Sequence, residues 1–266
     1  MAVDLQELLA DLQAETADLE SRLEPLTDDI WEWPTPAAGW RIRDQISHLA
    51  YFDEAAVLAA TDSARFLLEA EELMELGYGF PDLVARRYSK MAPCDLLNWF
   101  KSSRRQLLEV FADMDPKTRL AWYGPQMSAA SSVTARLMET WAHGQDVVDA
   151  LGLEREATNR LRHIAHLGVS TFGFAFEAHS RAVPVAQVRV ELTAPQGGGL
   201  WTWGPAQSDD RVIGRAEEFC LVVTQRRHVL DTELEVIGPV ATEWMSIAQA
   251  FAGPAGPGRK PDRPTG

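Results

Sequence analysis

Residues 35–49 read TPAAGWRIRDQISHL, and residues 139–147 read ETWAHGQDV. The first stretch leads into a segment with helical periodicity, which predicts a helix over 41–61. The positions four, seven and eleven residues after His48 are Phe52, Ala55 and Ala59. Because these positions share one helical face, His48 lies on an apolar stripe. We therefore expect His48 to point into the interior of a helical bundle.

The second stretch places Glu139 and His143 four residues apart on one expected helix. This spacing points two side chains the same way, about one turn apart, so both could bind one ion. Neutral imidazole and carboxylate suit Zn²⁺ and other divalent transition metals. With His48 from a neighbouring helix, they would form a His₂Glu set with positions left for water or substrate. A buried core histidine and a solvated Glu–His pair remain the alternatives.

The segments around these stretches predict that the first part of the chain is helical. Leucines spaced mostly by three, four or seven residues indicate an amphipathic helix over 4–26. Shorter helical pieces are expected over 62–92, a long helix over 93–114 and another over 154–180. A further helix should start near Ser131 or Ser132 and end at Leu151, before Gly152. We interpret residues 1–182 as a helical bundle.

The pattern changes at Pro184. Alternating apolar and polar residues in VAQVRVELTA predict a strand, and GGGLWTWGPA predicts a turn with a second strand. RVIG and TELEVIG are interpreted as strands, and GRAEEFCLVVTQRRH and PVATEWMSIAQAFAG as helices. Residues 183–253 are therefore expected to form a small α+β domain. Residues 254–266, rich in Pro and Gly, are expected to be a disordered tail.

The chain has 266 residues, 46% of them hydrophobic, and a formal net charge of -14. This composition supports a sizeable core. The acidic excess would repel phosphate backbones and anionic lipids, so neither nucleic acid nor a membrane is an expected partner. No uncharged apolar stretch reaches about 18 residues, and the first residues do not resemble a signal peptide. Cys94 and Cys220 indicate free thiols in a reducing, cytoplasmic location.

At the two quoted stretches the sequence resembles a known family. Residues 35–49 resemble the TP-x-x-GW-x-(V/I)-x-D-x-x-x-HL segment of the metal-binding domains of mycothiol-dependent maleylpyruvate isomerases, and residues 139–147 resemble that family's E-x-x-x-H motif. These domains belong to the DinB/YfiT-like superfamily. In this branch a small sterol-carrier-like domain follows the bundle, and residues 184–253 show a matching order of elements. The likeness is greatest to an actinobacterial subgroup described only as metal-binding proteins.

The resemblance implies a DinB-like four-helix bundle followed by a small sterol-carrier-like α+β domain. It implies His48, Glu139 and His143 as ligands of a divalent metal, with zinc as the expected ion. In the family's reaction a low-molecular-weight thiol adds to a cis double bond, the resulting single bond rotates, and the thiol leaves. The metal would lower the pKa of that thiol, because the thiolate is the nucleophile. The implied co-substrate is mycothiol.

Other residues are candidates for supporting roles. By the same resemblance Arg226 and Arg227 would bind a substrate carboxylate, although they could instead close the end of a helix. Gln225 stands where the family often has Gly, which weakens this assignment. Asp44 or Asp146 could orient an imidazole, and Asp146 could also act as a further ligand or a base; the alternative for both is a carboxylate on the helix surface. The residues interpreted as cofactor-binding are Trp40, Trp141 and Gln145, with core packing as the alternative for the tryptophans.

Three functions remain open from the sequence. The first is a thiol-dependent isomerase or S-transferase acting on a small carboxylate-bearing substrate. The second is a metal-assisted hydrolase or a tailoring enzyme of a biosynthetic pathway. The third is a non-catalytic protein that binds a metal or a lipophilic ligand. The expected partners are a small-molecule substrate and a low-molecular-weight thiol, and the expected assembly is a monomer or homodimer.

Overall fold

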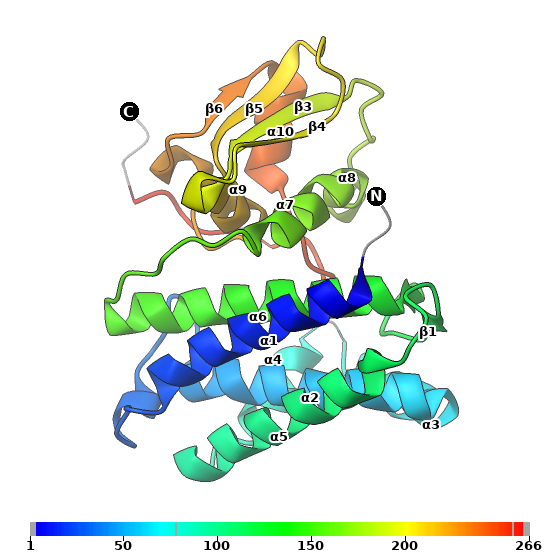
Figure 1. The fold of residues 1–266 in the computed structure, drawn as a ribbon, viewed down its shortest axis with the longest axis vertical. Coiled ribbons are helices and arrows are strands. Elements are labelled where there is room, and N and C mark those ends of the chain that lie inside the picture. The colour runs from blue at the N-terminus through cyan, green and yellow to red at the C-terminus, as the bar shows by residue number, and fades with distance from the viewer. Residues whose placement is uncertain (1–3, 78, 257, 263–266) are drawn as a thin grey trace. The chain divides into compact units, whose positions relative to one another are not determined.

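The computed structural model describes residues 4–77, 79–256 and 258–262. The chain divides into two compact units, Met1–Arg155 and Glu156–Gly266. The first unit is a bundle of helices, and the second combines a sheet with helices (Figure 1). The division falls earlier than the boundary at 182 that the sequence predicts, because α7 packs against α9 and α8 packs against α10. Among the described helices, none has the length and apolar character needed to cross a bilayer.

The first unit is built on four long helices that pair with one another. Helix α2 contacts α5 and α6, and α1 contacts the same two helices. A two-residue strand pair, β1 with β2, connects α5 to α6. The elements of this unit are α1 (Leu5–Leu23), α2 (Ile42–Thr61), α3 (Ser63–Met74), α4 (Phe80–Arg87), α5 (Pro93–Ala112), β1 (Arg119–Leu120), β2 (Met127–Ser128) and α6 (Ala129–Leu151).

Local signals in the sequence account for the ends of these helices. Asp4 begins α1, since its side chain accepts hydrogen bonds from the backbone N–H groups of Gln6 and Glu7. Helix α6 begins at Ala129, so the prediction of a start near residues 131–132 is wrong by two or three residues. The cap is Ser128, whose extended backbone lets its hydroxyl accept from the N–H of Ser131. Gly152 ends α6 with φ of 64°, as the sequence predicts.

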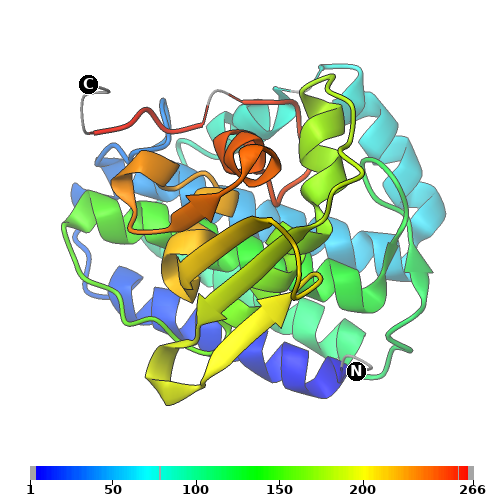
Figure 2. The same cartoon turned by 90° about the horizontal axis from the view of Figure 1, so that it is seen from above.

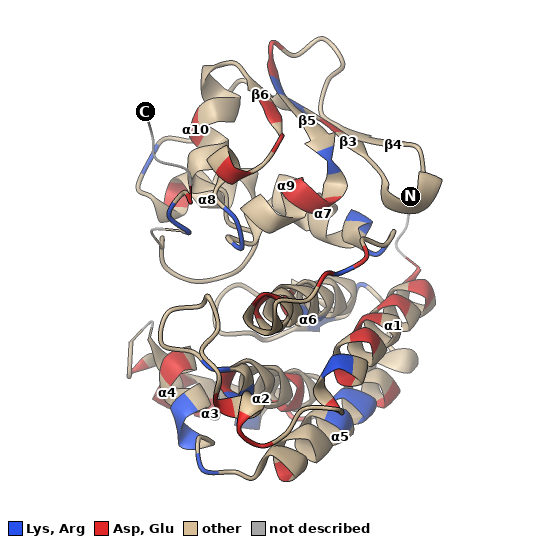
Figure 3. Cartoon of the chain, turned by 90° about the vertical axis from the view of Figure 1, so that its left-hand side faces the viewer, with Lys and Arg blue, Asp and Glu red and all other residues tan. Residues whose placement is uncertain are grey.

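The core of the bundle lies where α1, α2, α5 and α6 meet. One cluster of buried side chains joins these four helices and the loop before α2; its members include Leu19, Leu23, Trp31, Ile46, Leu49, Phe100 and Val147. A second cluster, which includes Phe52, Phe66 and Ala70, joins α2 to α3. The opposite faces are charged: acidic residues recur along α1 (Figure 3), in keeping with the net charge of -14. The helices are therefore amphipathic, as their periodicity predicts.

The second unit holds a four-stranded sheet with the order β4-β3-β5-β6 (Figure 2). Strand β3 pairs antiparallel with β4 and parallel with β5, and β5 pairs antiparallel with β6. Helices α9 and α10 contact the strands. The elements are α7 (Leu161–Ser170), α8 (Phe172–Ala178), β3 (Val188–Thr193), β4 (Leu200–Trp203), β5 (Asp210–Arg215), α9 (Ala216–Val223), β6 (Glu235–Ile237) and α10 (Pro239–Ile247).

The predicted α+β order of the second unit is confirmed, but one helix is not. A single helix over 154–180 is wrong, because residues 153–158 are irregular and α7 ends before α8 begins. The break falls at Thr171, whose hydroxyl bonds back to the carbonyl of Leu167. The described part of the predicted disordered tail, 254–256 and 258–262, contains no helix or strand. Residues 257 and 263–266 of that tail lie outside the described residues.

Candidate metal centre

Helices α2 and α6 bring three potential ligands together. His48 comes from α2, and Glu139 and His143 come from one face of α6. One ligand atom of each lies within 4.8 Å of the others. Glu139 Oε2 is 3.1 Å from His48 Nε2 and 2.9 Å from His143 Nε2. The residues that the sequence predicts as a His₂Glu set are therefore neighbours across the interface of two helices.

The surroundings of these residues favour the protonation states that a metal ion requires. Burial, together with the adjacent His143, lowers the pKa of His48 to about 4, so its imidazole is neutral at pH 7. Burial alone would raise the pKa of Glu139. The close contacts of its carboxylate with His143 and His48 outweigh burial and hold that pKa well below the usual range. Metal ligation needs neutral imidazole and ionised carboxylate, so this donor set fits a divalent ion.

A relay of hydrogen bonds fixes the orientation of His143. The hydroxyl of Thr35 donates to the carbonyl of Trp40 over 2.9 Å, and it accepts from Nε2 of Gln45 over 2.8 Å. Because Nε2 of Gln45 donates to Thr35, the amide oxygen Oε1 is the atom that contacts Nδ1 of His143, and it can only accept. Nδ1 of His143 must therefore carry the proton, which leaves Nε2 free to bind an ion. No pattern in the sequence predicts this role for Gln45.

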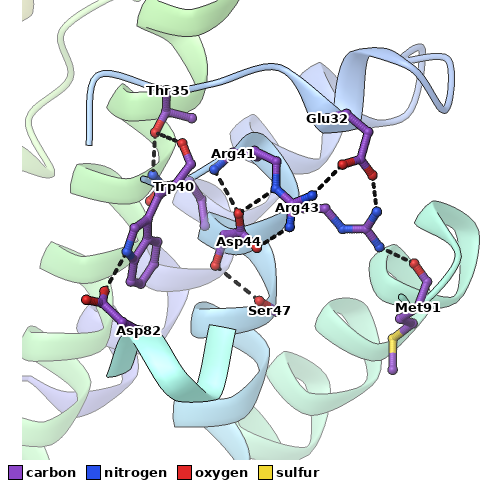
Figure 4. Close-up of polar contacts among 10 residues, drawn as sticks. Glu32, Thr35, Trp40, Arg41, Arg43, Asp44, Ser47, Asp82 and Met91 are labelled. Carbon is purple, nitrogen blue, oxygen red and sulfur yellow. Dashed lines mark hydrogen bonds and ion pairs between the residues drawn. The ribbon is translucent and has the colours of Figure 1, made fainter. Parts of the chain in front are cut away.

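The loop before α2 carries Trp40, whose ring and polar contacts are drawn in Figure 4. The Trp40 ring stacks on His143, with centroids 5.7 Å apart and planes 18° apart, and lies 5.4 Å from the His48 ring. Its indole N–H donates to Asp82 over 2.7 Å, which ties the loop to α4. Trp40 therefore lies beside the potential ligands, and its role in binding a cofactor stays a prediction. On the other side, the Phe52 ring lies 4.5 Å from His48.

Asp44 does not orient an imidazole, so that prediction is wrong. Its carboxylate accepts from the backbone N–H and from Nε of Arg41, each over 2.9 Å, and so caps the start of α2 (Figure 4). Arg41 also pairs with Glu32 over 2.6 Å, and Arg43 contacts both Glu32 and the carbonyl of Met91. Asp44 therefore holds the loop in place, and the next residue in the sequence contacts the histidine.

Three other candidates on α6 lie apart from the shared ligand atoms. Trp141 lies roughly 200° around the helix from Glu139, and its ring faces the guanidinium of Arg155, with Cζ 5.2 Å from the ring centroid. Gln145 donates to Asp149 over 2.9 Å. Asp146 is fully buried, on the face that carries His143. The structure brings Trp40 to the ligands but shows no contact between them and the side chains of Trp141 or Gln145.

The two candidate arginines belong to the second unit, just after α9. Nη1 of Arg226 donates to the carbonyl of Thr224 over 2.7 Å, and Nη1 of Arg227 donates to the carbonyl of Arg226 over 2.8 Å. Both contacts fit the alternative in which these residues close the end of a helix. Their role toward a substrate carboxylate stays a prediction, as does the base or ligand role of Asp146.

A buried ionic group behind the ligands was not predicted. Asp53 on α2 and Arg104 on α5 form an ion pair with a shortest distance of 2.7 Å, and both are at most 2% exposed. Arg104 also contacts Thr16 on α1 and Thr140 on α6, so the pair links all four long helices. Arg136, also buried, completes the group. Asp53 and Arg104 share helical faces with buried apolar residues, and this pattern indicates that both are buried. Their positions in the sequence do not predict that they pair with each other.

A cavity of about 310 Å³ lies beside α2. Its walls come from α2, α3, α5 and the loop before β2, and they include Tyr51, Glu54, Arg65, Phe66 and Tyr123. None of the three ligand residues lines it, so it is separate from the metal centre.

Neither cysteine belongs to the candidate centre. Cys220 is fully buried in α9, its Sγ donates to the carbonyl of Leu161 over 3.5 Å, and burial raises the pKa of its thiol well above the usual value. Cys94 is exposed near the start of α5. This agrees with the expectation that both are free thiols.

A four-helix bundle with three potential ligands on two of its helices, followed by an α+β unit, defines a DinB-like protein. Residues 12–148 match the family described as "Mycothiol maleylpyruvate isomerase N-terminal domain", and the chain belongs to this family. Residues 184–235 match a second family, described as "Wyosine base formation". The predicted family and fold class are thereby confirmed.

Similar proteins are known from sequence and from crystal structures. Two uncharacterized proteins of Mycobacterium tuberculosis, from strains CDC 1551 and H37Rv, are each 46% identical over 251 residues, covering 94% of this chain and 97% of theirs. The crystal structure of mycothiol-dependent maleylpyruvate isomerase matches with a TM-score of 0.56 and 16% identity, and that of a histidine-to-alanine mutant with 0.58 and 17%. Both matches cover 84% of this chain and 90% of the other. At this identity the likeness shows the fold alone.

Proposed function

We propose that this protein is a metal-dependent enzyme that uses a low-molecular-weight thiol. A divalent ion, zinc in the first instance, is held by His48, Glu139 and His143, and mycothiol is the co-substrate. The reaction is an isomerisation or S-transfer on a small carboxylate-bearing substrate. Membership of a family named for mycothiol maleylpyruvate isomerase supports the reaction class. The observation that most supports the proposal is that one potential ligand atom of each of these three residues lies within 4.8 Å of the others.

The residues around the ligands suit this chemistry. When bound, the ion would supply a positive charge that lowers the pKa of a thiol and so favours the nucleophilic thiolate. Gln45 holds the proton of His143 on Nδ1, which keeps Nε2 available as a donor atom. The rings of Trp40 and Phe52 flank His48 and exclude water from that side. Three protein ligands leave positions for a thiol and a substrate, which is typical of catalytic sites.

The substrate would meet the thiol at the exposed side of the centre. Glu139 is half-buried, whereas both imidazoles are buried, so solvent reaches the ligands past the carboxylate. We assign binding of the substrate carboxylate to Arg226 and Arg227, whose guanidinium groups suit bidentate contacts.

The first test is metal content of the purified full chain beside two variants. We expect about one equivalent of zinc in the wild type and in His166→Ala, whose histidine lies on α7, and none in His143→Ala. Mycothiol binding by calorimetry should require the metal-loaded protein, and maleylpyruvate with mycothiol is the first reaction to assay.

Two outcomes would count against this proposal. One is a wild type that cannot be loaded with any divalent ion, which would leave the histidines as packing residues. The other is mycothiol binding of equal strength with and without metal, which would remove the thiol from the centre. Metal binding without thiol binding would favour the metal-assisted hydrolase instead.

A further inference from the structure

Glu139 and three charged side chains behind it cross the middle of the bundle. Asp53 Oδ2 is 2.7 Å from Nε of Arg104, and Asp53 Oδ1 is 3.2 Å from its Nη2. Nη1 of Arg136 is 3.9 Å from Asp53 Oδ1, and Nη2 of Arg136 is 3.9 Å from Glu139 Oε2. Arg136 is 4% exposed. In such shielded surroundings charges interact more strongly than in water.

Arg136 makes no hydrogen bond with either carboxylate, because both are engaged elsewhere. Arg104 takes both oxygens of Asp53, and the two imidazoles contact Oε2 of Glu139. Nη1 of Arg136 is buried and has no hydrogen-bond partner among the described residues. Its Cζ lies over the Phe52 ring, 5.9 Å from the centroid. The guanidinium is thus held by packing and long contacts, and its charge is only partly neutralised.

We infer that Arg136 is a fixed positive charge that makes the metal centre select anionic ligands, a thiolate or a carboxylate, over neutral ones. The inference rests on the proposed function and names the ligand class of that same site. Arg136 acts at a distance through its charge. Its Nη2 lies 3.9 Å from Oε2 of Glu139, one of the potential ligand atoms, and no contact with the bound molecule is required of it.

The charges around the centre give the direction of the effect. The charges of Arg104 and Arg136 cancel those of Asp53 and Glu139, and neutral imidazoles add nothing. A divalent ion therefore brings two positive charges that this group does not balance, and an anionic ligand offsets part of them. Asp146, a buried residue about one turn beyond His143 on α6, is the same in the wild type and in every Arg136 variant, so it does not alter the comparison between them.

Arg136 acts with opposite signs on an ion and on an anion bound to it. A cation beside a ligating carboxylate repels a divalent ion, so Arg136 weakens metal binding. The same cation attracts a bound anion. At an effective dielectric of about 20, one charge a few ångströms away changes anion affinity by about tenfold or more. A residue that only supported the fold would weaken metal, anion and neutral ligands together.

The test uses the full chain loaded with Co²⁺, whose visible spectrum reports changes in its ligands. Thiocyanate is the anionic probe, and imidazole at pH 8 is the neutral probe. Arg136→Gln should bind thiocyanate about tenfold or more weakly, bind imidazole within about twofold of the wild type, and hold Co²⁺ at least as tightly. Arg136→Lys keeps the charge and should restore thiocyanate binding.

Each remaining outcome overturns the inference. Unchanged thiocyanate affinity in Arg136→Gln would show that the charge is not felt. An equal loss for thiocyanate and imidazole would show a structural role. Arg136→Met is a second neutral variant. If neither Arg136→Gln nor Arg136→Met folds, the wild type decides: binding imidazole as tightly as thiocyanate would overturn the inference. A wild type that takes up no Co²⁺ removes the proposed function as well, whereas the other failures leave it standing.

Discussion

Gln45 on α2 accepts a hydrogen bond from Nδ1 of His143 on α6, and its amide nitrogen donates to Thr35 in the preceding loop. One side chain thus joins the two helices that carry the ligands to the loop that carries Trp40. Partners of this kind set the tautomer and the ring orientation of a ligating histidine. The loop and the metal centre are therefore structurally coupled.

Replacing Gln45 by Leu should weaken zinc binding by roughly 10- to 100-fold, because His143 loses the acceptor that holds its proton on Nδ1. Competition with a chromophoric chelator measures this change. Gln145→Ala is the matched control, since Gln145 is also buried and bonds only Asp149 among the contacts described. An unaltered zinc affinity in Gln45→Leu would contradict the assignment of the tautomer.

The free energy of unfolding of the metal-free protein should decrease as the pH is lowered, because of His48. The pKa of this residue is about 4 in the folded chain and about 6.5 when unfolded. Between these values the unfolded chain binds a proton that the folded chain does not, so stability falls as pH falls from about 6.5 to about 4 and then levels off. Between pH 8 and pH 5 the loss should be about 2 kcal/mol.

Urea unfolding in the presence of a chelator measures this loss. His48→Gln lacks the titrating group, so its free energy of unfolding should fall less over the same interval. Identical pH dependence in the wild type and in His48→Gln would show that the imidazole is not held in its neutral form.

Arg104→Met should destabilise the fold by about 3 kcal/mol or more, because Asp53 would lose the partner of both its oxygens inside the bundle. Urea unfolding measures the change. Removing both charges in Asp53→Leu with Arg104→Met should recover part of the loss, since neither charge is then buried alone. The exposed Arg65–Glu69 pair is the control: Arg65→Met should change stability by less than about 1 kcal/mol.

Gly168→Ala should destabilise the second unit by about 1–3 kcal/mol. A Cβ at this position of α7 would lie 2.7 Å from Cγ2 of Val223 on α9, closer than packed atoms allow. Gly124→Ala is the control, because a Cβ there meets nothing within 4 Å. Thermal unfolding measures both. If adding Val223→Ala does not restore the stability lost in Gly168→Ala, the close packing of α7 on α9 is not the cause of that loss.

The periodicity of apolar residues was enough to predict the long helices and the order of strands. It predicts which face of a helix is buried, because that depends on residues three and four apart. It does not predict where capping occurs when several serines stand together, and Ser128, not Ser131 or Ser132, caps α6. It also misses the break between α7 and α8, which arises from one back-bonded threonine.

The candidate ligands could be predicted because two of them share a helix and the third lies within a distinctive segment. The residues that support them could not. Gln45 is 98 residues from His143, and Asp53 is 51 residues from Arg104. Which side chains meet across an interface depends on how far one helix is shifted along another, and packing decides that shift. The carboxylate of Asp44 suits the orientation of an imidazole better by residue type. The side chain that reaches His143, however, is that of Gln45.

The two cysteines differ in a way that is useful at the bench. Cys220 is enclosed and remains protonated, whereas Cys94 is exposed on the helix that pairs with α2. Maleimide reagents require an accessible thiolate, so a dye should attach at Cys94 alone in the folded protein. The native chain therefore carries a built-in position for one fluorophore. Energy transfer from that dye to a coloured ion would report occupancy in real time, without any engineered residue.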